Sequence, residues 1–506
     1  YEIKECDWSS DVCSSDLIDT DHASGTDGNV DFLGTIDADD ATANDRKLSI
    51  NAGSGTVTFG GNVGASEALA DLDVTAATIN LNAGTFDVSD AGSNTTKLSG
   101  AIVLGANVSF ITTGTADNNV DFNGTVNADD ATANNRTLTV TAGKGTATFG
   151  GDVGGSQALA DLDVTAATIN LNASSFHVDD DNSPAATVNV TGAVVLGADV
   201  TIDTDKATGS DNPLVITGTI DGNQGFVANA GASNITVTGA VGATTPVQSF
   251  SAQARGIITV SDIDASNGDS STATSGISIA SNSAKAGLIN INGDLTTSIS
   301  HATNGAGDIS IYATAAIVLD DGGNQVLLDA SNTGNGPAGT VTIGGGGVVA
   351  SKTDYQTGLA INTSSNGAGN SKAIDVSAIN FYRLDHLRAD AGDASVSAGV
   401  VAVDDGDHDD GPLLREGGAE RAGDARGVVG RFHEHLDGAV AAEAEPPHVV
   451  VVGRQIPRGD AWDAIAHHDA RDVGDVALEA AAADVADRRT LLGDEQARAG
   501  TTVGGS

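Results

Sequence analysis

The chain has 506 residues, of which 68 are acidic and 23 are basic, giving a formal net charge of −45 at pH 7. This charge argues against binding nucleic acid or an anionic membrane through phosphate contacts, and no window approaches the ~18 consecutive apolar residues of a transmembrane helix. Aromatic residues are only 3% of the chain and glycine fills 65 positions, so a core built from Val, Ile, Leu and Ala is expected, which favours a thin, repetitive fold.

The first 17 residues have a composition unlike the rest of the chain. They contain both cysteines, Cys6 and Cys13, and one of the two tryptophans, Trp8. Codons for Asp7–Leu17 can spell the adapter used in short-read sequencing libraries, and the segment resembles that adapter throughout. We therefore expect residues 1–17 to be an adapter-derived artefact that packs against nothing. The remaining chain has no cysteine, so no disulfide is expected, and the absence of methionine even at position 1 indicates a fragment.

A tandem repeat dominates the sequence that follows. Val30–Phe59 and Val120–Phe149 align without gaps at an offset of 90 residues, and Ala68–Ala83 is identical to Ala158–Ala173. A third, degenerate copy begins at Ile202. Internal repeats of this kind are typical of solenoid proteins. We assign one repeat region to residues 18–380, with copies at about 18–109 and 110–201 and degenerate sequence from 202.

Each copy contains a shorter unit in which apolar residues alternate with polar ones, a glycine follows, and another apolar residue comes two positions later. Examples are VDFLGTI at Val30–Ile36, VNVTGAV at Val188–Val194 and ITVTGAV at Ile235–Val241. Period-two alternation with β-branched residues predicts short strands, and the glycine suits a bend. The units recur roughly every 20–27 residues, about one turn of a solenoid. The sequence therefore predicts an all-β fold, a right-handed parallel β-solenoid of tandem repeats about 90 residues long.

Phenylalanine and asparagine positions indicate how successive turns would stack. Phenylalanines recur 27 residues apart in both copies, at Phe32, Phe59 and Phe86 and at Phe122, Phe149 and Phe176. We expect these rings to stack in the interior, with Phe59 and Phe149 pointing inward. Asn80 and Asn82 recur in the second copy. They form either amide ladders between turns or isolated Asx turns, and the sequence does not decide between the two.

A string of immunoglobulin-like β-sandwiches is the alternative fold, because about 90 residues is also the size of such a domain. A sandwich usually contains a large central aromatic residue, but this repeat has neither Trp nor Tyr. The repeat also contains its own shorter unit, which a sandwich does not need. We therefore prefer the solenoid.

The repeat region resembles the large β-strand-repeat surface proteins of bacteria, the filamentous-haemagglutinin-like and autotransporter-like adhesins. The resemblance rests on GAVVLGADVTIDT at Gly192–Thr204, ITGTIDG at Ile216–Gly222 and NITVTGAVGATTPVQSFSAQA at Asn234–Ala254. It implies a secreted or cell-surface scaffold with a structural or adhesive role outside the cell. The partner it implies is a surface ligand of unknown identity, either carbohydrate or protein.

The composition changes beyond Asn380. Residues 381–506 contain no Asn and no Lys, whereas 12 of the 15 arginines and 7 of the 10 histidines lie there. Lys and Asn share A-rich codons, so their joint loss indicates a change in base composition. We expect this Ala/Asp/Arg-rich tail to be chimeric, frame-shifted or disordered, without docking onto the solenoid.

Aspartates in equivalent loops of the first two copies are the candidate metal ligands. Asp39 and Asp40 recur as Asp129 and Asp130. Closely spaced carboxylates suit Ca²⁺, which prefers hard oxygen ligands. We therefore consider a calcium-stiffened loop beside a plain solvated one, and expect no other cofactor.

The alternative function is a polysaccharide-active β-helix enzyme, a lyase or hydrolase, in which these carboxylates act with Arg46 or Arg136. Repetition of the set argues against a unique active site. Residues 18–380 also have 38 acidic against 10 basic residues, so they would repel a polyanion. The three histidines of this region, His22, His177 and His301, are expected to be solvated loop residues. We therefore predict a scaffold and no enzyme.

Overall fold

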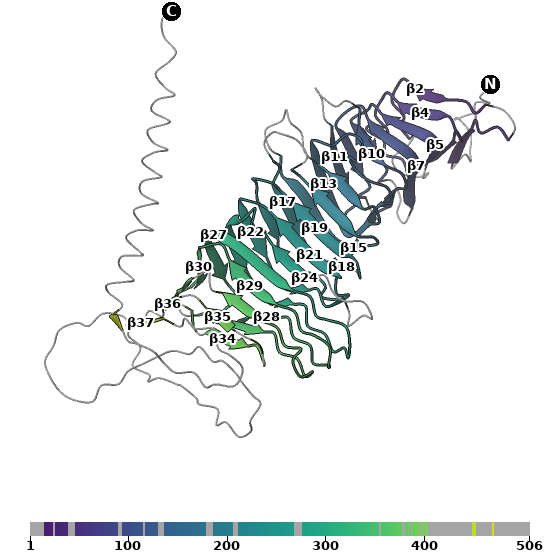
Figure 1. Cartoon of the computed structure of the whole chain (residues 1–506). Coiled ribbons are helices and arrows are strands. Elements are labelled where there is room, and N and C mark those ends of the chain that lie inside the picture. Colours follow the sequence, from purple (N-terminus) through teal and green to yellow (C-terminus); the bar gives the residue numbers. More distant parts are fainter. Residues whose placement is uncertain are drawn as a thin grey trace, which may run out of the picture.

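The computed structural model shows a rod of stacked β-strands (Figure 1). It describes residues 15–402, together with the strands β37 (His448–Val451) and β38 (His468–Asp469). Residues 24–25, 39–45, 90–93, 115–116, 130–135, 179–185, 206–210, 268–275, 354–355 and 377–379 and positions 383, 386, 393, 395 and 399 are outside this description. No helix in the described part of the chain is long and apolar enough to cross a membrane.

The strands form three ladders that run along the rod, and every strand pair within them is parallel. The first ladder contains β1 (Ser15–Asp19), β3 (Lys47–Asn51), the starts of β5 (Asp71–Leu81) and β7 (Thr95–Leu104), β9 (Asn119–Phe122), β12 (Thr146–Phe149), the ends of β13 (Asp161–Leu171) and β15 (Val188–Leu196), β18 (Ile220–Asp221), Val241, β23 (Ile263–Asp264), β26 (Leu295–Thr296), β28 (Val326–Asp329), β31 (Leu359–Asn362) and β34 (Leu387–Asp390).

The second ladder contains β2 (Val30–Phe32), β4 (Thr56–Phe59), the ends of β5 and β7, β10 (Val126–Ala128), Val153, β14 (Ser175–His177), β16 (Val200–Asp203), β19 (Gly225–Asn229), β21 (Ser249–Gln253), β24 (Gly276–Ile279), the start of β27 (Ile309–Leu319), β29 (Val341–Gly344), β32 (Ile374–Val376) and β35 (Val396–Ala398).

The third ladder contains Ile36, Val63, β6 (Thr85–Asp87), β8 (Val108–Ile111), β11 (Thr137–Thr141), the starts of β13 and β15, β17 (Leu214–Thr217), β20 (Ile235–Val237), β22 (Ile257–Val260), β25 (Ala286–Ile291), the end of β27, β30 (Val348–Ser351), β33 (Asn380–Tyr382) and β36 (Val400–Ala402). The chain visits the three ladders in turn, so each circuit is one turn of a parallel β-solenoid. A string of antiparallel sandwiches is therefore wrong for this chain.

Alternation along each strand directs apolar side chains into one continuous core and polar ones outward. In β11, for example, Leu138 and Val140 are fully buried, while Thr139 and Thr141 are only partly covered. The core extends from Leu48 to Ala391. Because each turn stacks only on its neighbours, the core lengthens with the number of turns.

Seven phenylalanines form an unbroken series of ring contacts at the N-terminal half of the core. Rings within one ladder stack, as Phe122 and Phe149 do at a centroid distance of 5.2 Å and an interplanar angle of 17°. Rings on different ladders meet edge to face, as Phe149 and Phe176 do at 5.7 Å and 79°. The interior stack is thus confirmed, but it moves between ladders and includes Phe110, which the 27-residue spacing omits.

Turn length varies around about 26 residues, and it does not divide the sequence repeat evenly. Ile50 lies in the first ladder, and three turns later the same ladder holds Phe122. Val140, the counterpart of Ile50 in the second copy, lies two ladders beyond Phe122, in the third ladder. One sequence copy therefore covers three and two-thirds turns, and successive copies place the same residues on different ladders.

Asn80 forms neither of the two arrangements expected for it. Its side-chain Nδ2 donates to Thr58 Oγ1 of the preceding turn at 3.4 Å. Asn170, its counterpart, donates to Thr148 Oγ1 at 3.3 Å. Both are asparagine-to-threonine links between turns.

The two ends of the rod differ from the expected boundaries. Ser15–Leu17 belong to β1 and pair with β3, so the expectation that residues 1–17 pack against nothing is wrong for these three. The ladders also continue beyond Asn380 through β33 to β36. β37 then pairs antiparallel with β36, so the tail does contact the solenoid through this strand.

Candidate functional site

Asp129 is the one predicted metal ligand that the structure describes, and it forms an ion pair. Arg136 Nε lies 2.9 Å from Asp129 Oδ1, and Arg136 Nη2 lies 3.0 Å from Asp129 Oδ2. This bidentate geometry satisfies both carboxylate oxygens with a cation of the protein itself. Asp39, Asp40 and Asp130 lie outside the described residues.

The two aspartate loops do not leave the same edge of the rod. The residues that flank the first loop are Ile36 of the third ladder and Lys47 of the first. The second loop follows β10 of the second ladder and precedes β11 of the third. Among the described residues, no group of three or more His, Cys, Asp or Glu side chains could hold a metal ion.

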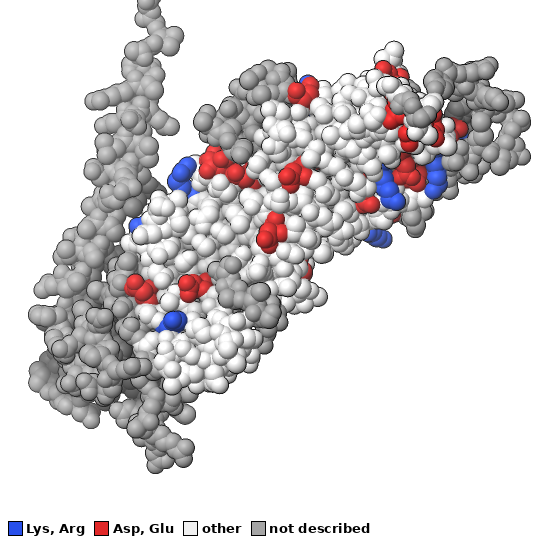
Figure 2. Space-filling view, turned by 45° about the vertical axis from the view of Figure 1, so that its right-hand side comes forward, with Lys and Arg blue, Asp and Glu red and all other residues white. Residues whose placement is uncertain are grey.

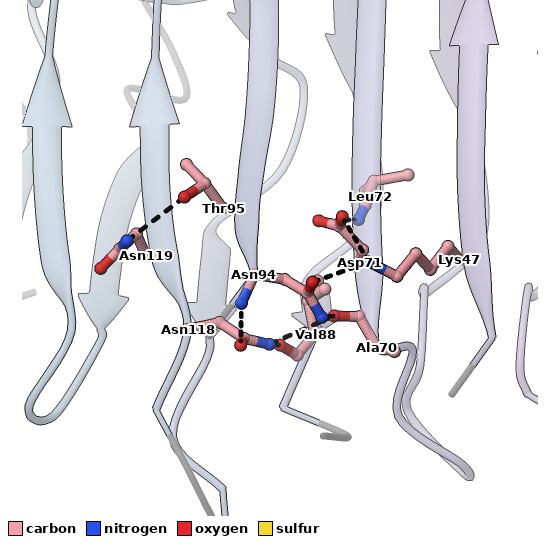
Figure 3. Close-up of polar contacts among 9 residues, drawn as sticks. All are labelled: Lys47, Ala70, Asp71, Leu72, Val88, Asn94, Thr95, Asn118 and Asn119. Carbon is pink, nitrogen blue, oxygen red and sulfur yellow. Dashed lines mark hydrogen bonds and ion pairs between the residues drawn. The ribbon is translucent and has the colours of Figure 1, made fainter. Parts of the chain in front are cut away.

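A polar network on the first ladder joins four successive turns (Figure 3). Its members are Lys47, Asp71, Asn94 and Asn118, which follow one another at intervals of 24, 23 and 24 residues. Lys47 Nζ lies 3.5 Å from Asp71 Oδ2 and donates to Asn94 Oδ1 at 2.7 Å. This network was not predicted from the sequence, because its members recur one turn apart and not at the 90-residue interval of the repeat.

Asn118 is the buried end of the network, with none of its surface exposed. Its Nδ2 donates to the carbonyl oxygens of Val88 at 2.8 Å and Ala70 at 3.2 Å, and its Oδ1 accepts from the backbone N–H of Asn94 at 3.0 Å. Asn212 makes the equivalent contacts one copy later, to Ala160 and Val178. These amides satisfy backbone groups that the ladders leave unpaired.

The second copy lacks the cation of the network. Thr137 stands where Lys47 stands in the first copy, and Asp161 takes the place of Asp71. Burial, followed by repulsion from Asp163, raises the pKa of Asp161 to about 6. Burial also raises the pKa of Asp71, but there the charge of Lys47 acts in the opposite direction.

We expect Asp161→Asn to raise the melting temperature by several degrees at pH 7.5 and to have little effect near pH 4. The ordinary pKa of 3.8 is raised in the folded state, so folding favours the protonated carboxyl. The resulting penalty is absent below about pH 4 and grows as the pH rises through about 6. Calorimetry at both pH values measures this difference. Thr137→Lys should also raise the melting temperature at pH 7.5, but by less. If Asp161→Asn raised the melting temperature equally at both pH values, the raised pKa of Asp161 would be contradicted.

Partly exposed aspartates at the loop bases link one turn to the next. Asp27 accepts hydrogen bonds from the backbone N–H and the hydroxyl of Ser54, both at 2.7 Å. These bonds, led by the hydroxyl, lower the pKa of Asp27 to about 2. Asp117 accepts from the backbone N–H of Lys144 at 2.6 Å in the second copy. The loop carboxylates of this position are therefore occupied as acceptors between turns.

His177 is not the loop residue that we expected. It lies in β14, partly buried, and its Nε2 is 2.9 Å from Ser175 Oγ. Its Nδ1 is buried and, within the described part of the chain, has no hydrogen-bond partner. Among the described residues, this pair has no acceptor of the kind that orients a catalytic histidine. His301 does lie in a loop, where its Nδ1 accepts from the backbone N–H of Asn304 at 2.9 Å.

The described residues thus arrange their polar groups mainly as links between turns. These links recur from copy to copy with substitutions, and the described residues that flank the two predicted aspartate loops lie on different ladders. Comparison of the chain with protein-family models, with curated proteins and with solved structures finds no match.

Proposed function

We propose that the chain is part of a secreted or cell-surface scaffold that displays repeated, weakly binding surfaces and acts in adhesion. The observation that supports this best is the continuous core of stacked turns, which extends from Leu48 to Ala391. A solenoid of this kind becomes longer with each stacked turn while its width stays the same, and it keeps its outer side chains in fixed positions. We take the coil to be right-handed, as nearly all parallel crossover connections are.

The outer surface supports display. Figure 2 shows acidic side chains scattered over the face in view, with most of the described surface carrying no charge. Asp, Asn, Ser and Thr side chains occupy the outward positions of many strands, as Thr148 and Asn170 do. Because the copies lie three and two-thirds turns apart, related surfaces face several directions around the rod. Such an arrangement suits many weak contacts with a carbohydrate or protein ligand.

Attachment should depend on the number of copies. A chain without residues 30–119 loses one copy, and the fold should persist because Val120 then follows the same loop as Val30 does. Beads coated with the full chain, with this shorter chain, or with a chain carrying one added copy would be tested on immobilised glycans and extracellular-matrix proteins. We expect avidity to rise by about 10²-fold across the series.

Two results would contradict this function. One is attachment that does not change with copy number, because a single site would then account for the binding. The other is cleavage of an acidic polysaccharide that Arg136→Ala abolishes, which would favour an enzyme. Calcium added to the binding buffer tests whether the loops at Asp39 and Asp129 take part.

A further inference from the structure

Three side chains on the first ladder bring together the groups needed to form an amide bond. Lys47 Nζ donates to Asn94 Oδ1 at 2.7 Å, and Asp71 Oδ2 lies 3.5 Å from the same nitrogen. The three residues come from three successive turns, and Figure 3 shows them converging beside the ladder. An amine, a carboxamide and a carboxyl group are the nucleophile, the electrophile and the proton carrier of a transamidation.

The amide of Asn94 is fixed with its oxygen toward Lys47. Asn94 Nδ2 donates to the carbonyl oxygen of Ala70 at 3.0 Å, and this oxygen can only accept. The ammonium group of Lys47 can only donate. In the reverse orientation, the amide NH₂ would face this ammonium group and the amide oxygen would face the carbonyl oxygen of Ala70, so neither hydrogen bond could form. The backbone N–H of Asn94 is also bonded to Asn118 Oδ1 at 3.0 Å. The electrophilic carbon is therefore held next to the amine, which favours reaction through proximity.

Asp71 is placed and tuned to transfer a proton. Its side chain is 12% exposed, and it pairs directly with Lys47 across the β3–β5 register. Burial, followed by repulsion from Asp73, raises the pKa of this carboxyl. A carboxyl group with a raised pKa takes a proton more readily than an ordinary one. The side chain of Lys47 is 39% exposed, which leaves a route for a small product to reach water.

We propose that Lys47 and Asn94 become joined by an isopeptide bond, with Asp71 as the proton-transfer residue. The ammonium group of Lys47 first gives a proton to Asp71, and the neutral Nζ attacks Cγ of Asn94. Asp71 then gives its proton to Nδ2, the Cγ–Nδ2 bond breaks, and ammonia leaves. The second proton of Nζ leaves with it as ammonium. An ammonium and a carboxamide thus become an amide and a free ammonium ion, with no oxidant or other reactant.

The bond ties together turns that otherwise interact only through hydrogen bonds and packing. It links residue 47 to residue 94 across the turn that contains Asp71. A solenoid unfolds by separating neighbouring turns, and a covalent link between them removes that route at this end of the rod. Such a link suits a scaffold under tension, but the chemistry does not depend on the proposed adhesive role.

The second copy serves as an internal control. Thr137 and Ala186 occupy the positions of Lys47 and Asn94, while Asp161 keeps the carboxyl group of Asp71. The second copy therefore cannot form the bond. Introducing both Thr137→Lys and Ala186→Asn supplies the two missing groups in a matched environment.

Intact-mass measurement of the full chain tests the proposal. We expect a mass about 17 Da below that of the sequence, from the loss of one ammonia, and a branched peptide joining Lys47 to Asn94 after digestion. Lys47→Arg and Asp71→Asn should each restore the full mass. The Thr137→Lys, Ala186→Asn double variant should lose about a further 17 Da.

The wild-type mass decides the outcome even if one of these variants does not fold. A folded wild-type chain at its full sequence mass, without a branched peptide, would overturn the proposal. A deficit mapped to any other pair of residues would overturn it as well. If the double variant shows no further loss, a lysine, an aspartate and an asparagine in this geometry are insufficient for the reaction. A mass deficit that persists in Asp71→Asn would show that the role given to Asp71 is wrong.

Discussion

Phe149→Asp is expected to destabilise the rod by about 5 kcal/mol or more, because it places an unpaired charge in the core and removes a large apolar side chain. Phe149 is fully buried. Its ring stacks on Phe122 at 5.2 Å and meets the edge of Phe176 at 5.7 Å. Neither neighbour offers a hydrogen bond to a carboxylate. Loss of the β-sheet circular dichroism signal at a lower urea concentration than in the wild type measures the effect.

Thr148→Asp is the matched control, because Thr148 is the adjacent residue of β12 and points outward. It introduces the same charge into the same strand, replaces the hydroxyl that accepts the bond from Asn170, and places the new carboxylate in register with Asp121 on the exposed face. We expect this variant to lose about 1 kcal/mol or less. Equal unfolding midpoints for the two variants would show that Phe149 is not in the core.

Gly218→Ala should cost about 3 kcal/mol or more, because both the backbone and the neighbouring turn exclude a side chain. Gly218 has a φ of +129°, which side-chain-bearing residues rarely adopt, and a Cβ there would lie 2.1 Å from the carbonyl oxygen of Gly192. Gly218 is the glycine of the unit Leu214–Ile220. The variant is therefore expected to unfold at a clearly lower temperature.

Gly34→Ala tests whether the position in the unit alone causes this loss, because Gly34 has neither the positive φ nor the close neighbouring turn of Gly218. Gly34 holds the same place in the unit Val30–Ile36, but a Cβ there would meet no atom within 4 Å. The Ala variant should retain the wild-type melting temperature within about 1 °C, as surface substitutions usually do. A similar loss in both variants would mean that neither the positive φ nor the stacked turn is the cause at Gly218.

The sequence predicts the strands and the core well, because both depend on local alternation. Leu138 and Val140 alternate with polar threonines in the sequence, and in a strand such alternation places both apolar side chains on the same face. The inward direction of Phe59 and Phe149 follows from the same rule and is confirmed. The glycine of the unit Leu214–Ile220 is also explained, since turns stacked as closely as Gly192 and Gly218 leave no room for a side chain.

The ladder that each strand joins could not be predicted, because it depends on the length of every turn before it. Pairing offsets are 24 residues from Lys47 to Asp71 but 32 from Ile277 to Ile309. Loop lengths therefore accumulate, and a 90-residue sequence copy ends two-thirds of the way around a turn. The network of Lys47 could not be predicted from the 90-residue repeat either, because its residues recur at intervals of 24, 23 and 24 residues, one turn apart.

A crystal structure of the chain tests the central claim, that the two sequence copies belong to one parallel solenoid and lie on different ladders. The expected result is Val140 in parallel register with Phe110 and Val164, while its counterpart Ile50 pairs with Ile18 and Val74. Antiparallel strands that close into a separate domain in each copy, or Ile50 and Val140 in the same ladder, would contradict the account.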